Sequence, residues 1–132
     1  MRYLTGNELD RAEFYIREAA EVAKSSRCSK SNRGVVIVKD DTIIGIGTNN
    51  PPLDLECKTD RCYDICNKYA VHAEQNAIFN GLRNSQKLEG SRMYHIKARN
   101  GEIVNSGEPS CVDCSKLVLQ TGIEDFVLKH ED

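Results

Sequence analysis

Apolar residues recur with helical spacing near the start of the chain. Between Thr5 and Ser26 they lie three or four positions apart, which predicts one amphipathic helix. The apolar positions are Leu9, Ala12, Ile16, Ala19, Ala20 and Ala23. The run Thr5-Gly6-Asn7-Glu8 has the form of a capping box. We therefore expect Thr5 and Glu8 to close the first turn with reciprocal hydrogen bonds.

Two short, almost wholly apolar runs follow this helix. GVVIVK (residues 34–39) and TIIGIG (residues 42–47) are separated by Asp40-Asp41. Apolar runs of this length that flank two turn residues predict a β-hairpin. Because apolar residues fill nearly every position, we expect both strands to be buried on both faces. Residues 48–68 are predicted to form a long loop.

Two further helices are predicted in the second half of the chain. YAVHAEQNAIFN (residues 69–80) is rich in helix-forming residues and precedes Gly81. CVDCSKLVLQ (residues 111–120) is followed closely by Gly122. Glycine is common just past the last residue of a helix, so both glycines are expected to end their helices.

Strands are predicted around these helices. Residues 92–98 lead to Asn100-Gly101, a strong signal for a tight turn, and residues 102–105 are expected to return as a short strand. Residues 123–129 form the last predicted strand. Alternation of helices and strands without a linker or repeat predicts an α/β fold in a single domain, residues 1–132.

Composition excludes several classes of function. A net charge of −2 gives no broad basic surface, and the absence of Trp with only three Phe leaves few platforms for stacking bases, so no stable nucleic-acid binding is expected. No apolar run is long enough for a membrane span. The first residues carry no apolar signal segment, so a cytoplasmic location is expected. Six cysteines then indicate metal ligation rather than disulfides.

The candidate chemistry lies in His72-Ala73-Glu74 and in Cys111-Val112-Asp113-Cys114. One imidazole and two thiolates hold three corners of a zinc tetrahedron and leave the fourth for water. Each group falls at the start of a predicted helix, where the helix dipole favours thiolates. The Glu74 carboxylate is then close enough to move protons between the water and a substrate. The sequence predicts a catalytic zinc ion held by His72, Cys111 and Cys114.

Plainer interpretations of these motifs exist. A single C-x-x-C also occurs in closed structural zinc sites and in redox pairs, and an H-A-E tripeptide alone indicates little. A closed structural site needs a fourth protein ligand, and none is obviously placed beside these three. A non-catalytic zinc-binding module remains an alternative, although such a module has no use for Glu74.

The chain resembles the zinc-dependent cytidine/deoxycytidylate deaminases, which carry the signature H-x-E…P-C-x-x-C. The resemblance is carried by residues 28–38, 43–52, 72–78 and 109–123. It implies a three-layer α-β-α fold with a central mixed sheet, which ends early, after the fourth core strand, where many relatives continue. An exposed sheet edge or an uncovered helix would favour a homo-oligomer.

The run H-A-E-x-N-A-I most resembles the deoxycytidylate branch, which implies conversion of dCMP to dUMP. In that branch an asparagine at the position of Asn49 contacts the sugar, and here Thr48 replaces the usual aromatic residue before it. Backbone N–H groups at Ala73 and at Ser110 or Cys111 are expected to hold the base. A deaminase of another base, nucleoside or aminopyrimidine is the main alternative.

Four cysteines remain outside the predicted catalytic site, namely Cys28, Cys57, Cys62 and Cys66. Some deoxycytidylate deaminases carry a second, structural zinc ion whose ligands come from these regions. The resemblance therefore implies a four-thiolate site that would pin the long loop to the sheet. The alternative is that these are ordinary buried or free cysteines.

Basic residues near the predicted strand ends have two interpretations. Lys30 and Arg33 precede the first strand, where they either meet a substrate phosphate or form a solvated rim. Lys97 and Arg99 alternate along the third predicted strand, and they too either bind a substrate phosphate or are simply exposed to solvent. His95, on that strand, is predicted not to bind the metal because the zinc already has its donors.

Overall fold

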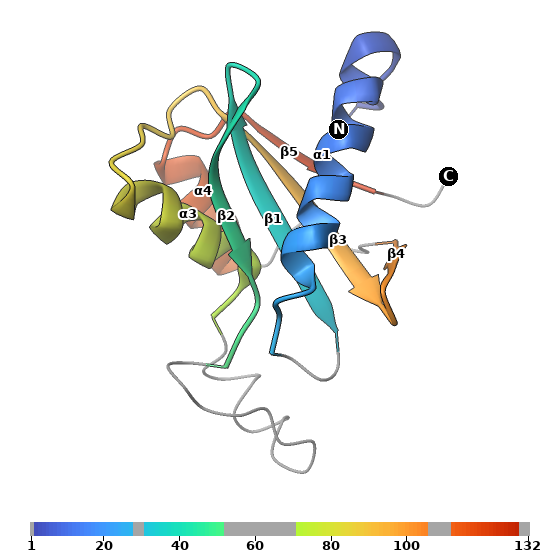
Figure 1. The fold of residues 1–132 in the computed structure, drawn as a ribbon. Coiled ribbons are helices and arrows are strands. Elements are labelled where there is room, and N and C mark those ends of the chain that lie inside the picture. The colour runs from blue at the N-terminus through green and yellow to red at the C-terminus, as the bar shows by residue number, and fades with distance from the viewer. Residues whose placement is uncertain (1, 28–30, 52–70, 106–111, 130–132) are drawn as a thin grey trace.

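The computed structural model of the protein describes residues 2–27, 31–51, 71–105 and 112–129. They form three helices and five strands: α1 (Gly6–Ala23), β1 (Asn32–Lys39), β2 (Thr42–Thr48), α3 (Ala73–Arg83), β3 (Arg92–Arg99), β4 (Glu102–Val104), α4 (Val112–Gln120) and β5 (Asp125–Leu128). Helix α1 covers one face of the sheet, and α3 and α4 cover the other (Figure 1). The predicted three-layer α-β-α arrangement is confirmed.

The strands make one mixed sheet in the order β2-β1-β3-β4. Strand β1 is antiparallel to both β2 and β3. The far side of β3 is divided between two partners: β5 runs parallel to residues 92–95, and β4 runs antiparallel to residues 97–99. As predicted, the sheet is mixed, and β5 is the last strand of the described residues.

Side chains of β3 alternate between the two cores. Tyr94, Ile96 and Ala98 pack under α1, whereas Met93 packs with Val35 against α3 and α4. Both β1 and β3 are therefore buried on both faces, as expected for central strands.

Strand β2 does not match the prediction of burial on both faces. It lies at the sheet edge, and Ile46 is 44% exposed. An apolar run does not reveal whether a strand will lie in the centre or at the edge of a sheet, because that depends on which other strands pair with it. The hairpin turn itself is as predicted: Asp40 and Asp41 have φ of 50° and 60°, the left-handed pair of a type I′ turn.

The opposite face of β2 is shaped for close contact with α3. A Cβ atom on Gly47 would lie 2.3 Å from the backbone N of Ala77 and 2.4 Å from the carbonyl O of Ala73, and one on Gly45 would lie 2.7 Å from the carbonyl O of Ala77. Glycine at both positions lets the two backbones touch. This contact fixes the first turn of α3 against the sheet.

Two predicted helix ends differ in the structure. Thr5 is the N-cap of α1 but makes no side-chain capping bond, and the Glu8 carboxylate binds the guanidinium groups of Arg2 and Arg92 instead of the Thr5 backbone. Gly81 lies inside α3 rather than after it. A Cβ atom on Gly81 would lie 2.9 Å from the Leu88 side chain, so a larger residue does not fit there. Close packing, not helix termination, explains this glycine.

Other predicted ends are confirmed. Gly122 follows α4 with φ +82°, and Asn100 and Gly101 have φ of 53° and 80° in the turn between β3 and β4.

In the described part of the chain, no helix combines the length and the apolar composition that crossing a bilayer requires.

Candidate metal centre and active site

The start of α3 presents His72 and Glu74. His72 is the N-cap, in an extended conformation, and its backbone N–H donates to the Gln75 side chain at 3.0 Å. Glu74 belongs to the first turn and is 5% exposed, whereas His72 is more exposed. The two residues do not share a helix face, but at the helix end both reach the same place, as predicted.

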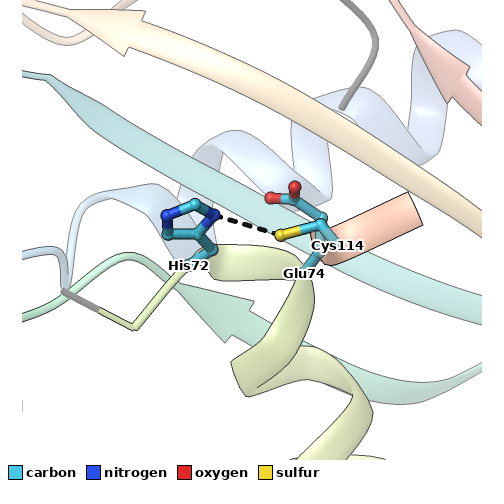
Figure 2. A group of neighbouring side chains, drawn as sticks. All are labelled: His72, Glu74 and Cys114. Carbon is cyan, nitrogen blue, oxygen red and sulfur yellow. Dashed lines mark hydrogen bonds between the residues drawn. The ribbon is translucent and has the colours of Figure 1, made fainter. Parts of the chain in front are cut away.

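Helix α4 brings Cys114 to the same point. Its Sγ lies 3.1 Å from Nδ1 of His72, and the residue is fully buried. The three candidate donor atoms, from His72, Glu74 and Cys114, all lie within 4.8 Å of one another. Figure 2 shows these side chains converging from the beginnings of two different helices.

The His72–Cys114 pair fits a zinc ion. Zn–N and Zn–S bonds at a tetrahedral angle put the two donor atoms about 3.6 Å apart, about 0.5 Å more than their 3.1 Å separation in the structure, so a small outward shift of either side chain would admit the ion. An imidazole and a thiolate are also the donor types that zinc prefers.

The structure does not test every predicted site residue. The third predicted ligand, Cys111, lies outside the described residues. So do six others with predicted roles: Cys28, Lys30, Cys57, Cys62, Cys66 and Ser110. Ala73, predicted to hold the base through its N–H, is buried in the first turn of α3 beside Glu74.

His95, predicted only not to bind the metal, lies beside Glu74 in the structure. It lies on β3 at 2% exposure, with Nε2 3.7 Å from Oε1 of Glu74 and 3.4 Å from a guanidinium nitrogen of Arg33. Burial lowers the pKa of His95 to about 4; the Glu74 charge opposes this shift and the Arg33 charge adds to it. The imidazole is therefore neutral at pH 7. The sequence held one signal for this placement: His95 comes two residues after Met93, so in a strand the two side chains lie on the same face, the one covered by α3 and α4.

The ring of His95 is held on several sides. It stacks on Phe126 of β5 with ring centroids 5.8 Å apart and an interplanar angle of 28°. Its neighbours across the sheet are Val35 on β1 and Leu128 on β5. In the described structure, the buried Nδ1 has no hydrogen-bond partner.

Asn49 holds the segment after β2. Its Oδ1 accepts from the backbone N–H of Arg33 at 2.8 Å and from the Ser26 hydroxyl at 2.9 Å, and its Nδ2 donates to the carbonyl of Ser31 at 3.0 Å. The neighbouring carbonyl of Thr48 accepts from the Asn76 side chain at 2.7 Å. These bonds tie the ends of α1, β1 and β2 to α3. The sugar contact predicted for Asn49 stays a prediction.

Two basic residues accompany His95 on this face of the sheet. Arg33 of β1 and Lys97 of β3 are direct cross-strand partners, and both are partly buried. Burial lowers the pKa of Lys97, and the positive charges of Arg33 and Arg99 lower it further. Like charges placed together favour an anion between them.

The geometry has a counterpart among known proteins. The sequence model of the cytidine and deoxycytidylate deaminase zinc-binding region matches residues 9–130. The chain belongs to this family. A deoxycytidylate deaminase of Mycobacterium phage D29 is 30% identical, over 90% of this chain and 94% of the phage protein. One from Schizosaccharomyces pombe is 27% identical over 86% of this chain, which spans 35% of the yeast protein.

Solved structures share the fold. The crystal structure of dCMP deaminase from the cyanophage S-TIM5 in complex with dCMP and dUMP has a TM-score of 0.73, with 25% identity over 98% of this chain and 86% of that one. A cytidine deaminase from Burkholderia pseudomallei has a TM-score of 0.61 at 16% identity, covering 91% of this chain and 87% of that one. The predicted family and fold class are confirmed.

Proposed function

We propose that the protein is a zinc-dependent hydrolytic deaminase that converts dCMP to dUMP. One observation carries the proposal: donor atoms of His72, Glu74 and Cys114 lie within 4.8 Å of one another at two helix starts. The sequence likeness to the phage D29 deoxycytidylate deaminase supports the choice of substrate.

In this proposal His72, Cys111 and Cys114 hold the metal. Bound zinc lowers the pKa of a coordinated water towards neutrality, which makes the water available as a nucleophile. Glu74 stays outside the ligand set, because its work is proton transfer. Its burial beside an imidazole and a thiolate keeps the carboxylate at the reacting centre.

Glu74 acts first as a base and then as an acid. It takes a proton from the attacking water and delivers it to N3 of the cytosine ring while the oxygen adds to C4. It then takes the remaining hydroxyl proton and delivers it to the amino group. The C4–N bond breaks, ammonia leaves and the uracil carbonyl forms. One carboxylate serves both steps because each proton it takes is handed on before the next arrives.

The proposed substrate contacts come from the ends of the central strands. Asn49 is proposed for the sugar, the Ala73 and Ser110 N–H groups for the base, and Lys30 with Arg33 for the phosphate. Arg33 lies near the proposed site, since its guanidinium contacts His95 next to Glu74. A site built to bond a sugar hydroxyl loses roughly 1–3 kcal/mol for each group left unpaired by a smaller ligand.

The test is ammonia release by the zinc-loaded protein across dCMP, CMP, deoxycytidine, cytosine, guanine and adenine. We expect the rate of ammonia release to be highest with dCMP and far lower with cytosine. In Asn49→Ala the difference between these two rates should shrink, mainly because dCMP is turned over more slowly. Equal activity on cytosine, or activity on purines alone, would move the protein to another substrate class within the family.

Three further features belong to the proposal. A second, structural zinc ion bound by Cys28, Cys57, Cys62 and Cys66 is proposed from the family resemblance. Self-association is supported by two apolar side chains on α3, Phe79 and Leu82, which are 47% and 53% exposed. A cytoplasmic location is proposed because the proposed metal sites need reduced thiols.

A further inference from the structure

Two basic side chains face each other across the centre of the sheet. Arg33 of β1 and Lys97 of β3 are direct cross-strand partners, and both are partly buried. Like charges directly opposite one another on a sheet are destabilising, and partial burial adds to the cost because it withdraws water from the charges. Burial and the neighbouring cations accordingly lower the pKa of Lys97. A negative charge placed between the two side chains would relieve the repulsion.

The described part of the protein does not supply that charge. Its ion pairs include neither Arg33 nor Lys97, which we call the cation pair. On β4 the residue opposite Lys97 is Val104. Arg99, two residues further along the same face of β3, is exposed and lies opposite Glu102. The next cation on the strand therefore has a carboxylate neighbour, whereas the cation pair has none among the described residues.

Arg33 is anchored in a way that leaves donors available. Its backbone N–H donates to Oδ1 of Asn49 at 2.8 Å, and one guanidinium nitrogen lies 3.4 Å from Nε2 of His95. A guanidinium carries only donors, so Nε2 is the acceptor. The other N–H groups of the guanidinium have no partner among the described residues. An arginine can bind a phosphate through two parallel N–H bonds, and a lysine beside it adds a point charge.

The cation pair lies beside the proposed reaction centre. The ring nitrogen of His95 that Arg33 contacts is 3.7 Å from Oε1 of Glu74. Asn49, which binds the backbone of Arg33, is the residue proposed for the sugar. The pair thus borders both the proposed acid–base residue and the proposed sugar contact. A phosphate esterified to that sugar is the anion expected there.

We propose that Lys97 is a specificity-determining residue, which joins Arg33 in binding the phosphate of the substrate and makes the protein prefer dCMP to deoxycytidine. This role rests on the proposed function and deepens it, because it assigns the choice between nucleotide and nucleoside to one side chain of β3. A phosphate dianion between the two cations would also offset their mutual repulsion.

The first test removes the ammonium group and keeps the apolar stem. For Lys97→Met we expect kcat/KM for dCMP to fall by about 10- to 100-fold, mainly through KM, because a charge-assisted contact to the phosphate is lost. Deoxycytidine has no phosphate, so its kcat/KM should stay within about twofold of wild type. Lys97→Arg keeps the charge and should retain most of the preference for dCMP.

Arg99→Met is the matched control, since it removes the same charge from the same face of the same strand. Arg99 is exposed and lies opposite Glu102, so we expect its loss to change kcat/KM for dCMP by less than about threefold. Urea unfolding separates binding from structure: Lys97→Met should be at least as stable as wild type, because it ends a cross-strand repulsion.

Three results would overturn the role. One is wild-type preference for dCMP in Lys97→Met. Another is an equal loss of that preference in Lys97→Met and Arg99→Met. The third is lower stability of Lys97→Met with equal losses on dCMP and deoxycytidine, which would make Lys97 merely structural.

A second test needs no turnover. Inorganic phosphate is titrated into zinc-loaded, ¹⁵N-labelled protein, and the backbone amide signals of residues 33 and 97 are followed. We expect saturable shifts at both amides in wild type and in Arg99→Met, and an affinity about tenfold weaker in Lys97→Met. No saturable shift in wild type, or the same affinity in Lys97→Met, contradicts the inference even if dCMP is a good substrate. The expected shifts in a protein that does not deaminate dCMP would instead refute the proposed function alone.

Discussion

Glu74 is the residue on which the proposed chemistry depends most directly. We expect Glu74→Gln to keep its zinc and to lose at least about 10²-fold in kcat, because an amide cannot exchange protons with water and substrate. Steady-state rates and metal analysis on one preparation check this. Cys114→Ala is the comparison: it should lose metal and activity together, since it removes a proposed ligand. Near-normal turnover by Glu74→Gln would refute the mechanism.

His95 gives the molecule an acid-sensitive stability. Its pKa is about 4 when folded and about 6.5 when unfolded, so between these values the unfolded chain binds more protons. The stability held by the neutral ring is complete above about pH 6.5 and is lost as pH falls towards 4. From pH 7 to pH 5 the loss is about 2 kcal/mol. The charged groups facing the ring are Glu74 and Arg33.

Urea unfolding at pH 7 and pH 5 measures this effect. His95→Gln is the control, because it keeps the shape of the site but cannot titrate in this range. Wild type should lose about 2 kcal/mol more than the variant over the same interval. Equal losses would mean that the ring is not held neutral by burial.

At the scale of elements, the contact between α3 and β2 places the proposed metal site. Gly47→Ala would push a methyl group against the backbone of Ala73 and Ala77, which cannot move aside as a side chain can. We expect a loss of about 1–3 kcal/mol in unfolding free energy, with lower kcat because the first turn of α3 shifts. Urea unfolding and activity check this. Ile46→Ala, on the exposed face of the same strand, should change both little.

The sequence predicts features that neighbouring residues decide. The Asp40-Asp41 and Asn100-Gly101 turns, the alternation of α3 and α4 with strands, and the joining of His72 to Cys114 were all predicted. Turn residues and metal-ligand motifs carry their geometry locally, so a single sequence is enough to find them.

The features that were missed depend on long-range partners. Glu8 was expected to cap α1, but the partly buried Arg92 on β3 competes for its carboxylate. Gly81 resembles a helix stop until Leu88 is seen packed against it. The contact of His95 with Glu74 depends on the register of β3 against β1, which no local pattern states.

At the scale of the whole molecule, the metal content tests the family resemblance. We expect roughly two zinc ions per chain, since a second ion bound by Cys28, Cys57, Cys62 and Cys66 would clip the long loop to the sheet. Elemental analysis and thiol titration of the folded protein measure this. One zinc per chain, with Cys57, Cys62 and Cys66 reacting freely, would rule out the second site. If Cys114→Ala loses one zinc ion per chain and keeps the other, the two proposed sites bind zinc independently.

The parallel pairing of β5 with β3 has a consequence for how the enzyme matures. Helix α4 lies between β4 and β5 in the chain, so the docking of β5 beside β3 helps to hold Cys114 near His72. Such a non-local pairing closes late, because the entropy of a long loop must be overcome first. We therefore expect a chain truncated before β5 to hold Cys114 less firmly beside His72. If the proposed zinc ion binds at His72 and Cys114, tight zinc binding would follow completed folding, and the bound ion would stabilise the docked β5.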